Sequence, residues 1–173
     1  MKGTIVKCLE ELVVSQFGKD KWEKSLEDVG LKKNTMFYTV RDVDDALVIK
    51  VVGAVCTNLG ITPPQAPDAF GDYWVNNYAQ KLYGQFFQKH KSAKDFMLDM
   101  DNVHITMTKT MKDAKPPRFK YEWKNDKTLV INYNSNRGLI DFAIGLTRGV
   151  GKYYNEKLAV SKLSPEKFQI VFA

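Results

Sequence analysis

Cysteine is scarce in this chain of 173 residues, which contains only Cys8 and Cys56. The two cysteines do not form a Cys-x-x-Cys pair, so the sequence supports neither a zinc site nor a thioredoxin-type motif. The Cys-x-x-Cys-His motif for covalent cofactor attachment is also absent. This use of cysteine predicts a protein of a reducing compartment.

Long apolar runs are missing as well. No run approaches the roughly 20 apolar residues that a membrane-spanning helix needs. The opening stretch MKGTIVKCLEELVV is amphipathic and carries acidic residues, unlike a signal peptide. We therefore expect a cytoplasmic protein without a membrane partner.

The net charge of +6 comes from lysines and arginines that are interleaved with acids along the whole chain. No basic run with interleaved aromatic residues is present, so we expect no nucleic-acid partner. The sequence also lacks a recognisable nucleophile with its base, a paired-carboxylate dyad and a glycine-rich phosphate loop. These absences favour a binding protein over an enzyme.

Hydrophobic periodicity changes along the chain from 3.6 residues to two. Helices are predicted over residues 4–17 and 19–29, from Asp42 or Asp44 to Gly60, and from Ser92 to Pro116. Two further helices are predicted after Thr62-Pro63-Pro64, where Gly71 and Gly84 either break the helical segment or pack it tightly. A β-hairpin over 118–123 and 128–133, a helix over 138–155 and strands over 158–163 and 168–172 follow. The length suits one domain. We predict an α+β fold, with a helical N-terminal half packed on a C-terminal half that holds a four-stranded antiparallel sheet and helices.

The helix that begins at Ser92 carries His104 within a stripe of methionines. Met97, Met100, Met107 and Met111 lie seven and four residues before His104 and three and seven residues after it. Such a stripe is usually core, and a lone histidine on it is usually a core residue. The same arrangement also suits the proximal side of a haem, where an imidazole holds the iron. Both interpretations stay open for this helix alone.

A second candidate site is the stretch Tyr133-Asn134-Ser135-Asn136-Arg137. If the strand continues, alternate residues face the same side, so Tyr133, Ser135 and Arg137 present two hydroxyls and a guanidinium to one place. Such donors can clamp a carboxylate or a phosphate. The alternative is a solvated strand end with an incidental arginine.

Four stretches together resemble the haem nitric oxide/oxygen binding (H-NOX) family. They are MKG at the start, MDNVHITMTK around His104, PPRF at 116–119 and YNSNR at 133–137. The family includes the haem domain of soluble guanylate cyclase and stand-alone bacterial sensors, and the resemblance covers essentially the whole chain. It implies one domain over 1–173, with a helical subdomain over about 1–60 and a haem-ligating α/β subdomain over about 61–173. A haem b would be buried between them.

The resemblance implies roles for individual residues. His104 matches the proximal iron ligand, and Tyr133, Ser135 and Arg137 match the propionate-binding motif. Pro117 and Ile5 match the residues that press the macrocycle out of plane, and Met1 would lie near the haem. Asp45 matches an acid that approaches the motif arginine. His90, in the polar stretch QKHKSAK, has no expected role.

Selectivity between gases would depend on the distal side. Oxygen-binding members carry a tyrosine where this chain has Phe142, and the tryptophan that supports the tyrosine is replaced by Leu9. Trp74 is either one possible distal donor or an aromatic residue of the pocket wall. The resemblance therefore implies a sensor, not an enzyme, that binds NO and CO and excludes oxygen.

The implied sensor is a monomer that signals to a histidine kinase or a cyclic-di-GMP enzyme when the proximal histidine is released. The alternatives are a haem-based oxygen or redox sensor and, less favoured, an interaction module without haem.

Overall fold

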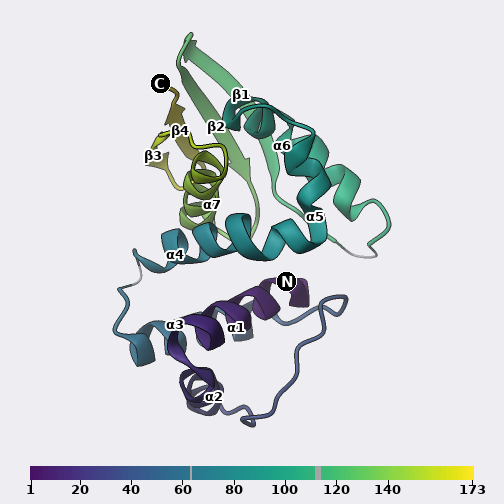
Figure 1. Cartoon of the computed structure of the whole chain (residues 1–173), viewed down its shortest axis with the longest axis vertical. Coiled ribbons are helices and arrows are strands. Elements are labelled where there is room, and N and C mark those ends of the chain that lie inside the picture. The colour runs from purple at the N-terminus through teal and green to yellow at the C-terminus, as the bar shows by residue number, and fades with distance from the viewer. Residues whose placement is uncertain (63, 112–113) are drawn as a thin grey trace. The chain divides into compact units, whose positions relative to one another are not determined.

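The computed structural model describes residues 1–62, 64–111 and 114–173 (Figure 1). The chain divides into two compact units, Met1–Ala66 and Pro67–Ala173. The first unit is helical, and the second combines helices with a four-stranded antiparallel sheet. The predicted α+β class is therefore confirmed.

The first unit is built from α1 (Gly3–Phe17), α2 (Lys19–Asp28) and α3 (Asp45–Leu59). Each helix buries one apolar face, and the buried side chains are Val6, Leu9, Leu12, Val13, Trp22, Leu26, Val48, Val51 and Val55. Helix α3 begins where Asp44 accepts a hydrogen bond from the backbone N–H of Leu47 at 2.9 Å. It ends at Gly60, whose φ of 65° is the left-handed conformation that glycine adopts without strain.

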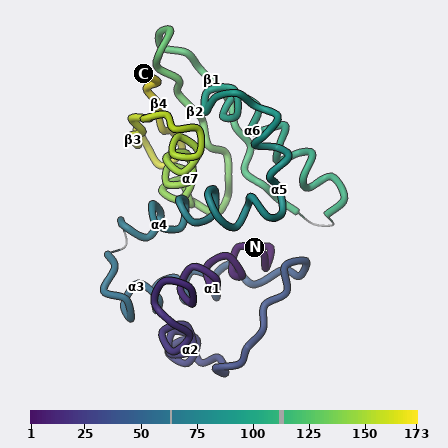
Figure 2. Tube along the Cα trace, in the orientation of Figure 1, coloured from purple at the N-terminus to yellow at the C-terminus, as the bar shows by residue number. Residues whose placement is uncertain are grey.

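The second unit contains, in chain order, α4 (Ala66–Tyr73, which starts at the unit boundary), the π-helical turn η1 (Trp74–Tyr78), α5 (Ala79–Gln88), α6 (Ala93–Thr108), β1 (Arg118–Asn125), β2 (Thr128–Asn134), α7 (Ile140–Tyr153), β3 (Ala159–Ser164) and β4 (Lys167–Val171). The tube in Figure 2 follows the chain from α5 through α6 into the β1–β2 hairpin.

The sheet of the second unit has the order β1-β2-β4-β3, with every neighbouring pair antiparallel. The central strands β2 and β4 carry fully buried Leu129, Ile131, Phe168 and Ile170. Helix α6 contacts β1, and α7 contacts β3 and β4. The sheet and these helices thus share one core, which also includes Phe96, Met97 and Ile144.

Two predicted boundaries differ from the structure. Ser92 caps α6 as predicted, but the helix ends at Thr108 and not at Pro116. The Thr108 hydroxyl donates to the carbonyl of His104 at 2.7 Å, and a turn from Thr108 to Met111 follows. The hydroxyl therefore competes for a carbonyl of the last helical turn. Residues 112–113 of the predicted helix lie outside the described residues.

The helical segment after Thr62 also differs from its prediction. Pro63, which was expected at the helix start, lies outside the described residues, and α4 begins at Ala66. The two predicted helices are present as α4 and α5, which are joined by the π-helical turn η1. Neither Gly71 nor Gly84 breaks them, but Gly71 packs tightly against α7. The Gln80 side-chain amide donates to the carbonyl of Val75 at 2.7 Å, and so binds an oxygen within this irregular turn.

Helices α4 and α7 approach each other through glycines. A Cβ added to Gly71 would lie 2.2 Å from the carbonyl carbon of Gly145, and one added to Gly145 would lie 2.0 Å from the carbonyl oxygen of Pro67. Only glycine permits this backbone contact. Along the same pair of helices, Arg148 binds both carboxylate oxygens of Asp68, at 2.7 and 2.9 Å.

We predict that Gly71→Ala lowers the free energy of unfolding by about 3 kcal/mol or more, because the new methyl group meets backbone that cannot rotate away. Gly84→Ala on α5 is the matched control. Its nearest neighbour would be the flexible Gln80 side chain at 3.7 Å, so helix propensity should stabilise this variant by about 0.5–1 kcal/mol. Urea unfolding of the full chain measures both changes, and equal stability of the two variants would contradict the contact.

Candidate functional site

His104 lies in the last turns of α6 and is held by the chain that leads into β1. Its Nδ1 lies 3.3 Å from the carbonyl oxygen of Pro117, and its ring packs against Phe119 with centroids 5.5 Å apart. A carbonyl can only accept, so Nδ1 carries the proton in this contact. The proton on Nδ1 leaves the lone pair of the neutral ring on Nε2.

The environment favours the neutral imidazole. Burial is the main cause that holds the pKa of His104 below its ordinary value. Nε2 makes no hydrogen bond to the described residues. Every buried polar side-chain atom among these residues has a hydrogen-bond partner. Nε2 is therefore not fully buried and reaches accessible space. A neutral, oriented imidazole with an accessible lone pair is a suitable metal ligand.

The methionine stripe around His104 is shorter than predicted. Met97 is buried, and Met100 and Met107 are half-buried on the same face of α6. Met111 lies beyond the end of the helix and is 37% exposed, so it does not extend the stripe. In the described ranges no three His, Cys, Asp or Glu side chains gather as a metal-ion cage. A metal held through His104 would therefore take at most one further ligand of these types from the described residues.

Asp101, one turn before His104, makes a contact that the sequence did not predict. Arg118 donates to both its oxygens, from Nε at 2.8 Å and from Nη2 at 2.6 Å, and the backbone N–H of Phe119 donates at 3.0 Å. Tyr121 accepts from the backbone N–H of Asp101 at 3.3 Å. These bonds tie α6 to β1 beside His104. An acid on a helix surface is usually solvated. Asp101 differs because α6 packs against β1, a contact that the sequence alone does not show.

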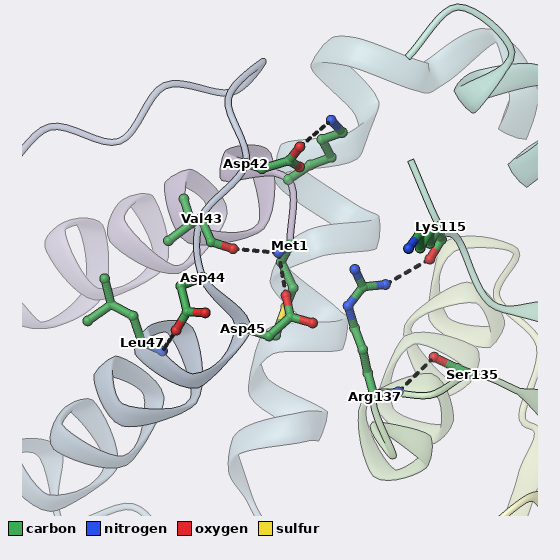
Figure 3. A network of polar contacts seen from close by, with 10 residues as sticks. Met1, Asp42, Val43, Asp44, Asp45, Leu47, Lys115, Ser135 and Arg137 are labelled. Atoms are coloured by element: carbon green, nitrogen blue, oxygen red, sulfur yellow. Dashed lines mark hydrogen bonds and ion pairs between the residues drawn. The ribbon is translucent and has the colours of Figure 1, made fainter. Parts of the chain in front are cut away.

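The three residues of the predicted carboxylate clamp lie at the end of β2. Tyr133 is within the strand and is 6% exposed, but Ser135 and Arg137 follow the strand in a turn. The Ser135 hydroxyl accepts from the backbone N–H of Arg137 at 3.3 Å, and Arg137 Nη1 donates to the carbonyl of Lys115 at 2.7 Å (Figure 3). Strand alternation therefore does not place Arg137; a turn does.

Trp74 and Phe142 belong to a row of aromatic rings in the second unit. Phe70 contacts both, with centroids 5.9 Å from Trp74 and 5.7 Å from Phe142, and Trp74 lies 5.4 Å from Tyr78. Trp74 and Tyr78 begin and end the π-helical turn. The sequence indicated Trp74 and Phe142, but Phe70, which contacts both rings, was not singled out, because one aromatic residue among several in a helical segment carries no signal beyond core packing.

The remaining predicted residues lie in the first unit. Leu9 is buried and Ile5 is half-buried on α1. The α-amino group of Met1 donates to the carbonyl of Val43 at 2.6 Å and pairs with Asp45 (Figure 3). Asp45 thus has a partner within its own unit, and its expected approach to Arg137 stays a prediction.

The expectation that His90 has no role in haem binding stays a prediction. Its side chain is only 9% exposed and binds the carbonyl of Phe86 and the carboxylate of Asp99. The turn after α5 thus folds the imidazole back onto α6.

These residues fit a haem. His104 supplies a neutral nitrogen ligand, and the end of β2 supplies hydroxyl and guanidinium groups for carboxylates. The sequence matches the family described as HNOB, haem-NO-binding, over residues 2–162. The chain belongs to the haem-NO-binding family. The predicted recognition and the haem b cofactor are therefore confirmed at the level of this family.

Relatives and solved structures agree with this assignment. The chain is 26% identical over 160 residues, 88% of its length, to soluble guanylate cyclase gcy-32 of Caenorhabditis elegans. It is 24% identical over 156 residues, 89% of its length, to soluble guanylate cyclase 89Da of Drosophila melanogaster. In both cases it covers 23% of the relative, so the chain spans about a quarter of these cyclases.

Among solved structures, the chain resembles an oxygen-binding H-NOX domain related to soluble guanylate cyclases, with a TM-score of 0.83 at 25% identity over 99% of this chain and 95% of that one. It shares its fold with a mutant H-NOX protein of T. Tengcongensis, with a TM-score of 0.84 at 24% identity over 99% and 97%. No helix in the described ranges is both long enough and apolar enough to cross a membrane.

We predict that Asp101→Asn lowers the free energy of unfolding by about 1–2 kcal/mol at pH 7, because a charged acceptor of three hydrogen bonds is lost. The hydrogen bonds from Arg118 are the main cause that holds the pKa of Asp101 below its ordinary value. A lowered folded-state pKa stabilises the protein above the unfolded pKa, so the difference should shrink as the pH falls below about 4. Asp141→Asn, which removes an exposed pair with Lys162, should cost less than about 0.5 kcal/mol. A difference that is unchanged down to pH 3 would contradict this role.

Proposed function

We propose that this chain is a haem-based gas sensor that binds NO and CO and excludes oxygen. The observation that carries the proposal is the state of His104, whose Nδ1–H is bound to Pro117 while Nε2 reaches accessible space. Bound haem would supply a ferrous iron that takes a diatomic gas, and His104 would be the residue that holds this iron. Holding of the haem, selection among gases and signalling would depend on residues of the chain.

Each candidate residue receives one role in this proposal. His104 holds the iron, and the hydroxyls of Tyr133 and Ser135 and the guanidinium of Arg137 bind the propionates. The remaining residues, assigned by family resemblance, are Pro117 and Ile5 against the macrocycle and Met1, Leu9, Trp74 and Phe142 around the gas. The two compact units then form a single domain of 1–173 that is cytoplasmic and monomeric.

The distal residues support selectivity against oxygen. Bound oxygen carries partial negative charge and needs a hydrogen-bond donor, whereas NO depends on one far less. Phe142 offers no donor, and its ring is held by Phe70 at 5.7 Å. A missing hydrogen bond to a charged acceptor, worth about 1.5–3 kcal/mol, lowers affinity roughly 10- to 100-fold.

Signalling would pass from α6 into the sheet. Release of His104 would free the last turns of α6, and the bonds from Arg118 and the Phe119 N–H to Asp101 would carry the displacement into β1. The contacts proposed for Ile5 and Pro117 with the bound haem would then change. A partner protein, in bacteria a histidine kinase or a cyclic-di-GMP enzyme, would respond to the changed surface.

A second candidate function is oxygen sensing, and Trp74 favours it. The indole N–H of Trp74 has no hydrogen-bond partner among the described residues, and no buried polar side-chain atom among them is unpaired. An accessible indole N–H in the aromatic row could serve as a donor to a bound gas.

We expect His104→Ala to lose stable haem binding, because no other described imidazole can take its place: His90 is held by Phe86 and Asp99. Added imidazole should restore a visible haem spectrum. Ile105→Ala changes the adjacent, exposed residue of α6 and should retain haem. Equal haem content in the two variants would remove His104 from the site.

The unmutated ferrous protein should bind NO and CO and form no stable oxygen complex in air, as measured by visible spectroscopy. Phe142→Tyr should raise oxygen affinity only partly, because Leu9 cannot hold the new hydroxyl in place. A stable oxygen complex in the unmutated protein would contradict NO selectivity. If Trp74→Phe then abolished that complex, the second candidate function would be supported.

A further inference from the structure

His90 lies between two hydrogen-bond acceptors in the turn that joins α5 to α6. Its Nδ1 is 2.8 Å from the carbonyl oxygen of Phe86, and its Nε2 is 3.1 Å from a carboxylate oxygen of Asp99. Phe96 meets the imidazole edge-on, with centroids 5.4 Å apart and planes at 87°. The ring is thus buried, oriented and bonded at both nitrogens.

The two partners determine which form of the ring fits. A carbonyl oxygen and an ionised carboxylate only accept hydrogen bonds. The neutral imidazole has a single N–H, so it would face one acceptor with a lone pair, whereas the imidazolium donates to both. Asp99 is ionised, because the amide of Asn102, followed by Lys89 and His90, holds its pKa below the ordinary value.

We propose that His90 is a positioning residue which, as an imidazolium, ties the end of α5 to the middle of α6 and so holds the helix that carries His104. The link from α6 to gas sensing rests on the proposed function. The tie itself depends only on the contacts within the second unit.

Other contacts near the turn between α5 and α6 do not involve an imidazole. The Tyr154 hydroxyl donates to the carbonyl of Phe87 at 2.7 Å, and burial raises the pKa of Tyr154, so it remains a donor. Glu156 accepts from the backbone N–H of Ala93 at 3.0 Å. The other charged group beside the pair is Lys89, whose Nζ lies 3.7 Å from Asp99. Imidazole is the side-chain type whose unperturbed charge changes between about pH 5 and 8, so a change of pH tests a tie that needs the imidazolium.

A double-mutant cycle tests the tie. His90→Gln, Asp99→Asn and the double variant of the full chain are unfolded in urea at pH 5.5 and at pH 8.5. The coupling between the two sites should be about tenfold in the unfolding equilibrium constant at pH 5.5 and should fall to about twofold at pH 8.5. The same cycle on Lys162 and Asp141, an exposed pair, should show about twofold coupling or less at both pH values. Coupling that is absent at pH 5.5, or equal at the two pH values, would overturn the proposal.

Hydrogen exchange tests whether the tie holds α6. At pH 5.5, His90→Gln should speed exchange of the backbone amides of residues 97–101 about tenfold and leave those of α7 unchanged. Unchanged exchange in α6 would overturn the positioning role.

If the variants fail to fold, the unmutated protein still decides the question. Nitrogen-15 NMR at pH 5.5 should detect two ring N–H protons of His90 that exchange slowly, and rapid exchange of either would overturn the tie.

None of these measurements depends on haem binding. A colourless protein that shows the coupling would contradict the proposed function alone, and a haem-loaded protein without coupling would contradict this inference alone.

Discussion

The hydrogen bond from His104 to the carbonyl of Pro117 is the contact on which the candidate site depends. It joins a helix to the start of a strand thirteen residues later, and it fixes which ring nitrogen carries the proton. The bonds of Asp101 to Arg118 and Phe119 hold the same two elements together one turn away. The imidazole and the residues that lead into β1 are therefore linked by two sets of hydrogen bonds, so a displacement of one acts on the other.

The parts of the fold that follow from local pattern were predictable. Ser92 caps α6, Asp44 caps α3 and Gly60 ends α3, because each of these effects acts within one helical turn. The antiparallel hairpin of β1 and β2 also follows from alternation and turn residues. What could not be predicted depends on groups far apart in the sequence.

The errors show this dependence. The end of α6 at Thr108 was missed because no glycine or proline lies between Thr108 and Pro116, and nothing local shows that the chain must return to His104. The contacts of His90 were not predictable from its polar sequence neighbours, because its partner Asp99 lies on the next helix. Arg137 was indicated by strand alternation and by the resemblance, but the turn that places it was not. The haem family itself was recognisable because several of its motifs are short and contiguous.

The position of His104 within α6 has a consequence for how far the helix must move. Thr108, the last helical residue, lies only four positions after His104, and its hydroxyl already bonds to the His104 carbonyl. Final turns of helices fray at a small cost in free energy, because their carbonyls lack partners within the helix. The opposite end of α6 is capped by Ser92 and Glu156. The imidazole thus lies near the C-terminal end of α6, where the last turn opens at low cost, whereas the N-terminal end is capped. Its displacement requires the opening of one turn and leaves the rest of the helix intact.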